Sequence, residues 1–392
     1  MNELIVRIAA RGDGVTASGR HVATGVPGDA VLDDGALAFG AHHQMPPCRH
    51  FPECGGCQLQ HADDEAYRDY LVSRVETALA QHDLTADIRE PHLSPPNSRR
   101  RATLRALKVG GGVALGFNAE KSHRIVDMRE CHILRPELFA LVAPLRELLV
   151  DLLPPRRTAE VQLTLIDRGA DVLLKGVDGE GLTAIEQLTA FAVQHRLARL
   201  SVDHGLGPEV SYEPEPATVT LSGAPVAFPP GAFLQATADG EAALIAAVRD
   251  AIGDARRTAD LFAGLGTFAL AVRAAYAAEA SRDIAAALKR AAPAIAVEHR
   301  DLYRRPLDVP ELAKFDAVVL DPPRAGAAEQ VAALARSSVA RIAYVSCNPA
   351  TFARDARSLA DGGYALLWVK PVGQFRWSTH AELAAAFQRR PR

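Results

Sequence analysis

The C-terminal part of the chain predicts an α/β fold with a doubly wound, mostly parallel sheet. From about residue 229 onward, short apolar runs alternate with segments of helical spacing, which is the pattern of strand–helix–strand units. A glycine-containing turn follows the first run, and carboxyl or thiol side chains directly follow later ones. In such a sheet, ligands bind beyond the carboxyl ends of the strands, so we expect these side chains to surround one pocket.

Seven apolar runs are the expected strands of this region. Helices fit between the first five runs, and a short loop joins the last two, which predicts a terminal antiparallel pair. The runs span residues 258–262, 275–278, 294–297, 315–320, 341–345, 365–370 and 380–385.

The region before this sheet predicts an α+β unit with its own core, which we bound at residues 44–228. Two pairs of alternating segments read as hairpins, and three segments have helical spacing. The expected hairpins are 101–109 with 113–117 and 160–166 with 171–175, and the expected helices are 63–81, 136–153 and 183–195.

Residues 1–43 read as short strands broken by glycine and proline turns, which indicates a small β-barrel-like segment. With 392 residues in all, the chain exceeds what one hydrophobic core usually organises, so three domains are expected.

The composition is that of an ordinary soluble protein, with 48% apolar and 23% charged residues. No apolar run approaches the ~18 residues that span a bilayer, and the N-terminus lacks the pattern of a signal peptide. We therefore expect a cytoplasmic protein that does not contact membranes.

The formal net charge of −3 does not by itself support nucleic-acid binding, but basic residues are clustered. The usual interpretation of such a cluster is a solvated face. The first run comprises Arg99, Arg100, Arg101, Arg105 and Lys108, and Lys121, His123 and Arg124 follow it.

Four of the five cysteines lie in the first third of the chain, and Cys347 stands alone. Cys48, Cys54 and Cys57, with the distant Cys131, could supply four thiolates to either tetrahedral zinc or a [4Fe–4S] cluster. The spacing leaves both metals open. The Cys-x3-Cys-x2-Cys spacing of radical S-adenosylmethionine enzymes is absent, which excludes that class.

Cys347 follows the expected strand 341–345, separated from it only by Ser346, and its neighbours Ser346 and Asn348 are polar. Pro349 is suited to the first turn of a helix, and a thiol beside a helix N-terminus is expected to favour the thiolate. Asp321, in the sequence Asp-Pro-Pro-Arg, follows another expected strand in the same way. A thiol and a carboxyl group should therefore meet in one pocket.

A second motif indicates a nucleoside-containing cofactor. The sequence Asp-Leu-Phe-Ala-Gly-Leu-Gly-Thr, residues 260–267, is a strand-to-helix turn whose glycines let a ligand approach the backbone. Glu279 ends the next expected strand, where an acidic residue can bind a ribose. The third glycine of a dinucleotide fingerprint is missing, so S-adenosylmethionine is favoured over a dinucleotide.

Several motifs together resemble the RNA (uracil-5-)-methyltransferase family, and most closely its iron–sulfur branch that methylates 23S ribosomal RNA. The resemblance runs in order from about residue 46 to the C-terminus. Its motifs are the cysteine set, Phe233-Leu-Gln235, the glycine turn at 260–266, Asp321-Pro-Pro-Arg-Ala-Gly326, Ser346-Cys-Asn-Pro349 and His380-Ala-Glu382.

The resemblance implies a Rossmann-like class I S-adenosylmethionine-dependent methyltransferase domain at residues 229–392. It implies that residues 44–228 form an iron–sulfur and RNA-binding region and that residues 1–43 form a TRAM or OB-type segment. The expected activity is formation of 5-methyluridine in RNA, with 23S ribosomal RNA as partner, by a monomer that does not act on DNA. The expected cofactors are S-adenosylmethionine and a [4Fe–4S] cluster on Cys48, Cys54, Cys57 and Cys131.

The resemblance also assigns roles in the site. C5 of uracil is a poor nucleophile, so a thiolate must first add at C6, and Cys347 is the candidate. A general base must then remove the C5 proton, and the family motif places this role on Glu382. The matching cofactor-binding positions are Gln235, Phe262, Thr267, Glu279, Asp301 and Asp321.

Three alternatives remain at this point. The same chemistry could act on transfer RNA, although bacterial transfer-RNA enzymes of the family generally lack the cysteine set. An adenine or glutamine amino-methyltransferase would fit Asp-Pro-Pro, but Arg324 replaces the aromatic residue of that motif and Cys347 would have no role. A non-catalytic iron–sulfur RNA-binding protein would leave both Cys347 and Glu382 unexplained.

Overall fold

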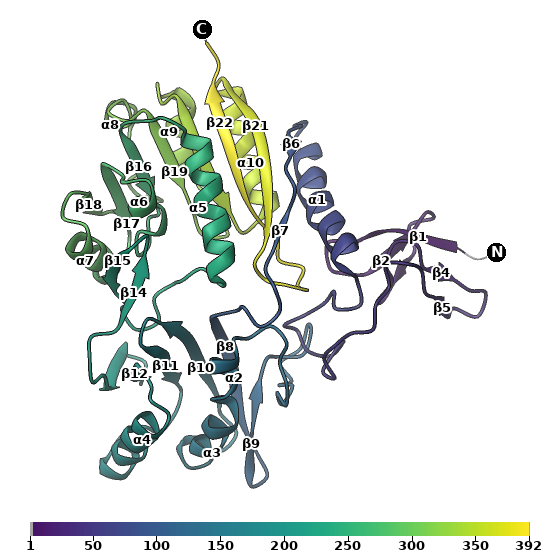
Figure 1. Cartoon of the computed structure of the whole chain (residues 1–392), viewed down its shortest axis with the longest axis vertical. Coiled ribbons are helices and arrows are strands. Elements are labelled where there is room, and N and C mark those ends of the chain that lie inside the picture. The colour runs from purple at the N-terminus through teal and green to yellow at the C-terminus, as the bar shows by residue number, and fades with distance from the viewer. Residues whose placement is uncertain (1–2, 392) are drawn as a thin grey trace.

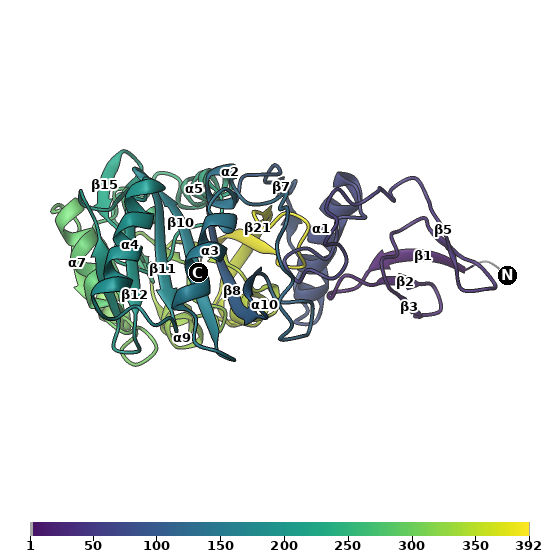
Figure 2. The ribbon, with the colours of Figure 1, turned by 90° about the horizontal axis from the view of Figure 1, so that it is seen from below.

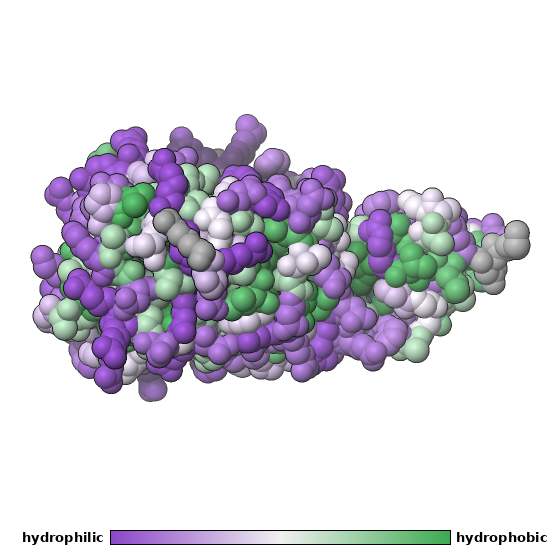
Figure 3. All heavy atoms as spheres, turned by 90° about the horizontal axis from the view of Figure 1, so that it is seen from above, coloured by the Kyte–Doolittle hydropathy of each residue, from purple (hydrophilic) through white to green (hydrophobic). Residues whose placement is uncertain are grey.

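The computed structural model describes residues 3–391 and has three parts (Figure 1). A small N-terminal sheet projects from one side, a central sheet with its helices lies below, and a large C-terminal α/β unit lies above. Seen from below, the N-terminal sheet stands apart from the rest of the molecule (Figure 2). The space-filling view from above shows it as a separate lobe (Figure 3).

The N-terminal part is an antiparallel sheet with strand order β3-β2-β1-β4-β5. The buried carboxylate of Asp29 organises it, because it accepts hydrogen bonds from the backbone N–H groups of Val26 (2.9 Å) and Gly40 (2.7 Å) and pairs with the ring of His43 (2.8 Å). The strands are β1 (Glu3–Ile8), β2 (Gly14–Thr16), β3 (His21–Val22), β4 (Ala30–Val31) and β5 (Leu37–Ala38).

The central part is a six-stranded sheet, with order β13-β12-β11-β10-β8-β9, packed on helices α3 and α4. Both predicted hairpins are present, but the helix expected at 136–153 is split into α2 (Pro136–Phe139) and α3 (Val142–Leu152). The split places Pro144 in the first turn of α3, where its missing N–H costs no helical hydrogen bond. The other elements are β8 (Arg101–Val109), β9 (Gly112–Gly116), β10 (Thr158–Ile166), β11 (Gly169–Lys175), α4 (Leu182–Gln194), β12 (Arg199–Asp203) and β13 (Pro208–Tyr212).

The C-terminal unit contains all seven strands that the sequence predicts, in the order β18-β17-β16-β19-β20-β22-β21. All run parallel except β22, which is antiparallel to both neighbours, so the expected terminal antiparallel pair is confirmed. The strands are β16 (Thr258–Leu261), β17 (Tyr276–Glu279), β18 (Ala296–His299), β19 (Ala317–Leu320), β20 (Arg341–Ser346), β21 (Tyr364–Gly373) and β22 (Glu382–Arg389).

Helices cover both faces of this sheet. One face packs on α5, whose Leu244 and Val248 share a core cluster with Val319 and Val345. The opposite face packs on α9 and α10. The remaining elements are the hairpin β14 (Thr218–Leu221) and β15 (Ala224–Ala227), and the helices α5 (Ala238–Ile252), α6 (Thr267–Ala271), α7 (Arg282–Ala291), α8 (Val309–Leu312), α9 (Ala328–Arg336) and α10 (Pro349–Asp361).

A segment from the first third of the chain completes the C-terminal sheet. Two short strands, β6 (Asp87–Ile88) and β7 (His92–Leu93), pair in parallel with the outer edge of β21. The preceding helix α1 (Asp64–Ala80) contributes Val75 and Leu79 to the core cluster that includes α10. Residues assigned to the central region thus pack as part of the C-terminal unit. Within residues 3–391, no helix is both long and apolar enough to cross a membrane.

Candidate active site

The functional side chains predicted from sequence gather at one edge of the C-terminal sheet. The parallel strands β16 to β20 end at this edge, and the antiparallel strand β22 begins there. A cavity of about 660 Å³ opens at the edge. It is lined by all eight predicted catalytic and cofactor residues: Gln235, Phe262, Thr267, Glu279, Asp301, Asp321, Cys347 and Glu382.

Cys347 lies in the turn between β20 and α10. As predicted, Pro349 opens the helix, and Asn348 caps it by accepting a hydrogen bond from the N–H of Ala350 (3.1 Å). The expectation that this position favours the thiolate does not account for the groups that the fold places around Cys347. Burial, together with the nearby Glu382 and Asp321, raises the pKa of the Cys347 thiol.

Glu382 is the first residue of β22 and is only 6% exposed. Burial, followed by repulsion from Asp321, raises the pKa of its carboxyl group to about 8, and the nearby Arg101 guanidinium opposes this shift. Glu382 is therefore largely protonated at neutral pH in this environment. From sequence alone it would pass for a surface residue, and only the family motif singled it out.

Asp321 follows β19 at the base of the cavity, and burial raises its pKa to about 7. Its Oδ2 atom lies 3.4 Å from the side-chain nitrogen of Gln235, which donates to it. The loop after Asp321 is fixed to the start of α10, because the carbonyl of Arg324 accepts hydrogen bonds from the side chains of Asn348 and Thr351, each at 3.1 Å.

The glycine turn after β16 has the open backbone that a cofactor needs. Gly264 and Gly266 have φ values of +55° and +95°. A Cβ on Gly264 would meet no atom within 4 Å, whereas a Cβ on Gly266 would lie 2.4 Å from Leu288. Gly264 thus faces open space, and Gly266 lets α7 pack closely.

Glu279 ends β17 beside this turn. Its two carboxylate oxygens accept hydrogen bonds from the N–H groups of Gly264 (2.9 Å) and Ser281 (2.7 Å). Phe262 and Tyr303, which also line the cavity, form a tilted ring pair with centroids 5.5 Å apart. Asp301 follows β18 and accepts a hydrogen bond from the N–H of Tyr303 (3.0 Å).

The basic run at 99–101 is not a solvated face, which corrects the interpretation from sequence. Arg99 and Arg101 line the cavity, and the guanidinium of Arg101 lies 4.2 Å from the ring centroid of Phe233. Arg100 instead has internal partners, since it pairs with Glu241 (2.7 Å) and donates to the carbonyl of Gln235 (3.0 Å). The start of β8 therefore brings two cations to the cavity wall.

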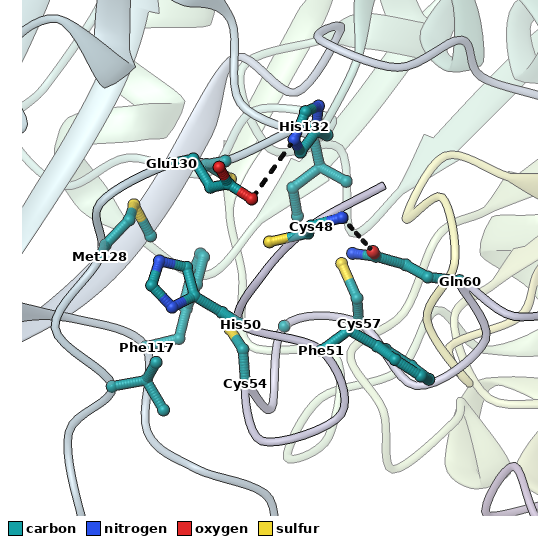
Figure 4. A pocket seen from close by; sticks show the side chains of 14 residues that line it. Cys48, His50, Phe51, Cys54, Cys57, Gln60, Phe117, Met128, Glu130 and His132 are labelled. Carbon is teal, nitrogen blue, oxygen red and sulfur yellow. Dashed lines mark hydrogen bonds and ion pairs between the residues drawn. The ribbon is translucent and has the colours of Figure 1, made fainter. Parts of the chain in front are cut away.

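The four N-terminal cysteines surround one separate pocket, shown in Figure 4. Cys48, Cys54, Cys57 and Cys131 line it, and burial raises the pKa of each thiol. Four thiol groups are the kind of donor set that thiolate-bound metal centres use. As placed in residues 3–391, no group of three or more His, Cys, Asp or Glu side chains has the arrangement that would hold a metal ion.

The two glycines between Cys54 and Cys57 serve close packing. A Cβ on Gly55 would lie 2.7 Å from the carbonyl oxygen of Asn118, and one on Gly56 would lie 3.1 Å from the ring of Phe117. Gly56 and Phe117 line the large cavity as well as the cysteine pocket. The two sites therefore share a wall.

Comparison with known proteins identifies the family. An uncharacterised RNA methyltransferase of Zymomonas mobilis subsp. mobilis is 52% identical over 98% of both chains. A 23S rRNA (uracil(1939)-C(5))-methyltransferase of Chromohalobacter salexigens is 32% identical over 88% of this chain and 76% of the relative. The family described as tRNA (uracil-5-)-methyltransferase matches residues 293–390. The protein belongs to the RNA (uracil-5-)-methyltransferase family.

A solved structure supports the fold of this methyltransferase. The crystal structure of Pyrococcus abyssi tRNA (uracil-54, C5)-methyltransferase, in complex with S-adenosyl-L-homocysteine, has a TM-score of 0.73 and 21% identity over 99% of both chains. The predicted Rossmann-like class I methyltransferase fold is confirmed, and the N-terminal sheet is compatible with the predicted small barrel-like segment.

The loop between β21 and β22 connects the cysteine pocket of the methyltransferase to its active site. The carbonyl of Trp377 accepts hydrogen bonds from the N–H groups of Gln58 and Leu59, both at 2.8 Å. The Trp377 ring packs against Cys57 in a small apolar cluster. Phe375 and Ser378, from the same loop, line the catalytic cavity.

The sequence reasoning assigned no role to two buried polar residues of the methyltransferase. Asp260 lies within β16, is fully buried and has no hydrogen-bond partner for either oxygen among the described residues; burial, Asp321 and Glu279 raise its pKa well above the ordinary value. Gln374 directly follows β21, whose carboxyl end lies at the same edge as those of β19 and β20. The strand expected at 365–370 ends four residues before Gln374, whereas β21 extends to Gly373, so only the full length of the strand shows that Gln374 lies at this edge.

Proposed function

We propose that the protein methylates C5 of a uridine in RNA, with S-adenosylmethionine as the methyl donor and a covalent bond between Cys347 and C6 of the base. The observation that carries the proposal is the meeting of a thiol, Cys347, and a buried carboxyl group, Glu382, in one cavity with the glycine turn at its other end. S-adenosylmethionine would supply a methyl group from its sulfonium centre.

Cys347 would act first. Its thiolate adds to C6, a sulfur–carbon bond forms, and the electron pair of the C5=C6 bond moves toward O4, which makes C5 nucleophilic. C5 then takes up the methyl group. The helix N-terminus at Pro349 and the guanidinium of Arg101 face the charge that Cys347 carries before this addition.

Glu382 would then remove the proton from C5, so that the C5=C6 double bond re-forms and the sulfur leaves as a thiolate. The raised pKa values of Glu382 and Cys347 show that two negative charges are costly here. Once the sulfur is bonded to carbon it no longer carries a charge, so ionising Glu382 becomes easier when a base is required.

The opposite end of the cavity would hold the methyl donor. We assign its binding to Phe262, Thr267, Glu279 and Asp301, with Gln235 and Asp321 between donor and base. The carboxylate of Glu279 is suited to the ribose hydroxyls, and the glycine turn leaves the backbone accessible. A stacked uridine cannot reach Cys347, so the base must leave its helix to enter the cavity.

We further propose that Cys48, Cys54, Cys57 and Cys131 bind a [4Fe–4S] cluster, because all four thiols border one pocket and methyl transfer leaves Cys347 as the separate nucleophile. The centre would have a structural or RNA-shaping role, since methyl transfer moves no net electrons into the protein. We propose a monomeric cytoplasmic enzyme whose N-terminal segment ends at about residue 43 and whose central region ends at about residue 228, with the segment from α1 to β7 belonging to the C-terminal unit.

We propose 23S ribosomal RNA as the substrate, on the strength of the four cysteines and of the 32% identical ribosomal enzyme. Transfer RNA is the second candidate, because the solved neighbour acts on it. Anaerobic incubation with labelled S-adenosylmethionine and separate ribosomal and transfer RNAs, followed by nucleoside analysis, distinguishes the two. Label in 5-methyluridine from transfer RNA alone would overturn the ribosomal assignment.

RNA that contains 5-fluorouridine tests the mechanism, because fluorine at C5 cannot leave as a proton does. The enzyme should form a methylated covalent complex that survives denaturation. Cys347→Ala should form none, while Glu382→Gln should still form it, since the base acts only after the bond is made. Absence of the complex with wild-type enzyme, donor and RNA would refute the covalent mechanism.

A further inference from the structure

The side chain of Gln374 lies behind the cavity wall and forms hydrogen bonds with two cavity residues, Gln235 and Glu382. It is 1% exposed and does not line the cavity. Its nitrogen donates to Oε1 of Gln235 (2.7 Å) and to Oε2 of Glu382, and its oxygen accepts from the N–H of Thr237 (3.3 Å). Both N–H bonds and the carbonyl of this amide are therefore used.

These contacts set the orientation of Gln374 without ambiguity. The N–H of Thr237 can only donate, so the Gln374 oxygen must face it and the nitrogen must face the other two partners. The first turn of α5 packs directly on this side chain, since a Cβ on Gly240 would lie 2.7 Å from the Cβ of Gln374. The amide thus has a rigid surrounding that holds it in place.

The orientation of Gln374 determines how its partners face the cavity. Because Oε1 of Gln235 accepts from Gln374, its nitrogen is left to point toward Asp321. Because Oε2 of Glu382 accepts from Gln374, the proton of the neutral carboxyl group is confined to Oε1. One buried amide therefore decides which atoms of two cavity residues are available to ligands.

We propose that Gln374 is a positioning residue for the reaction: it holds the carboxyl group of Glu382 for removal of the C5 proton and turns the amide of Gln235 toward Asp321. This inference rests on the proposed function, in which Glu382 is the base. The N–H that Gln374 donates also stabilises the ionised form of Glu382. The other charged and titratable groups that face Glu382 are Arg101, which favours its ionised form, and Asp321 and Cys347, which disfavour it.

The test is Gln374→Met, which keeps the volume and removes every hydrogen bond. With natural uridine RNA and the methyl donor, proton removal should slow about tenfold or more, as expected when a base is misplaced. The variant should therefore accumulate the methylated Cys347 adduct, as Glu382→Gln should. The pH at which the rate is half-maximal should rise. The matched control is Gln330→Met, which removes another fully buried amide, bonded to Leu307, and should leave the adduct level and pH profile unchanged.

Gly240→Ala provides a second route if Gln374→Met does not fold, because it displaces Gln374 without removing its amide. Slower turnover in either variant, with no adduct and an unchanged pH profile, would show that Gln374 has only a structural role and would overturn the proposal. Turnover at the wild-type rate would also overturn it, because Gln374 would then have no role in the reaction.

A measurement without RNA separates this inference from the proposed function. In ligand-free enzyme, Gln374→Met should make thermal stability fall more steeply between pH 6 and 9, because ionised Glu382 loses a donor. The steeper fall should disappear in the double variant with Glu382→Gln. If wild-type enzyme forms no 5-methyluridine while this pH effect is present, the proposed function fails and the contact stands. If the pH effect is absent, the inference fails.

Discussion

Cys347 and Glu382 lie opposite each other across two paired strands. Ser346, the last residue of β20, pairs with Leu383 of β22. Cys347 and Glu382 each lie one residue beyond this pair, on the cavity side. An antiparallel strand at this position of the sheet therefore places the nucleophile and the base together, although 35 residues separate them along the chain (382 − 347).

The buried carboxyl groups should make the ligand-free enzyme less stable as pH rises. The pKa values of Asp321 and Glu382 are raised from 3.8 and 4.5 to about 7 and about 8. The folded state then binds more protons than the unfolded chain, so this stability is present at low pH and is lost as pH rises through about 7 to 8. Asp321→Asn or Glu382→Gln should stabilise the protein at pH 8.5 by on the order of 1–2 kcal/mol.

Thermal unfolding from pH 5 to 9 checks this sign. Glu311→Gln is a control of opposite sign, because hydrogen bonds from Arg300 lower the pKa of Glu311 to about 2. That variant should lose stability above about pH 4.5 and match the wild type only in strong acid. Destabilisation by Glu382→Gln at pH 8.5 would contradict the buried, largely neutral state of this residue.

Arg101 should keep the reaction active near neutral pH. Its charge faces Cys347 and Glu382, both of which must ionise. Arg101→Met should raise both pKa values and shift the pH profile of methylation upward by about one unit, which is about a tenfold loss of rate on the rising limb. Arg101→Lys keeps the charge and should shift the profile less. An unshifted profile in Arg101→Met would mean that Phe233, on which Arg101 stacks, and not the charge, is the important contact.

The cysteine set should hold about four irons and four sulfides per chain in anaerobically purified protein. Cys54→Ser and Cys131→Ser should lose most of both. Cys347→Ser is the matched control on the fifth cysteine, and its iron and sulfide should equal those of the wild type. Stoichiometric zinc without sulfide in wild-type protein would show that the pocket binds a single metal ion instead.

Removal of the proposed metal centre should change the fluorescence of Trp377. The ring packs against Cys57, and the protein has two tryptophans, so Trp368→Phe leaves Trp377 as the sole indole fluorophore. Chelation under oxidising conditions should increase the emission of Trp377, because the proposed cluster beside Cys57 no longer quenches it, and should shift the emission to longer wavelength, because water reaches the ring. The complementary variant, Trp377→Phe, should show little change on chelation. Equal responses from both would mean that the whole chain unfolds.

The sequence predicted which side chains line the cavity because strand ends can be recognised locally. An apolar run followed by Glu279 or Asp321, or by Ser346 and then Cys347, indicates both the strand and the edge of the sheet at which the next side chains lie. The direction of the pKa shift of the Cys347 thiol was predicted wrongly, because the sequence argument favoured the thiolate and the fold raises the pKa. Its neighbours in sequence form a helix N-terminus, but its neighbours in space are two carboxyl groups that only the fold brings close.

Other parts lacked a local signal. Strands β12 and β13 and the hairpin β14–β15 were not predicted, because short strands without clear alternation resemble loops. Gln374 was overlooked because an amide after a strand has no distinctive chemistry until its partners are known. Residues 99–101 resembled a solvated basic run, and only the packing of β8 against the catalytic unit shows that Arg100 is internal.

The pairing of β6 and β7 with β21 affects how the chain can be made and divided. The ribosome synthesises β6 and β7 early, long before the strand they complete. A fragment that begins at residue 229 would expose the outer edge of β21, and a bare strand edge readily recruits a second molecule. The catalytic unit is thus continuous in space but not along the chain, and a recombinant version must carry the segment from α1 to β7 to keep the edge of β21 covered.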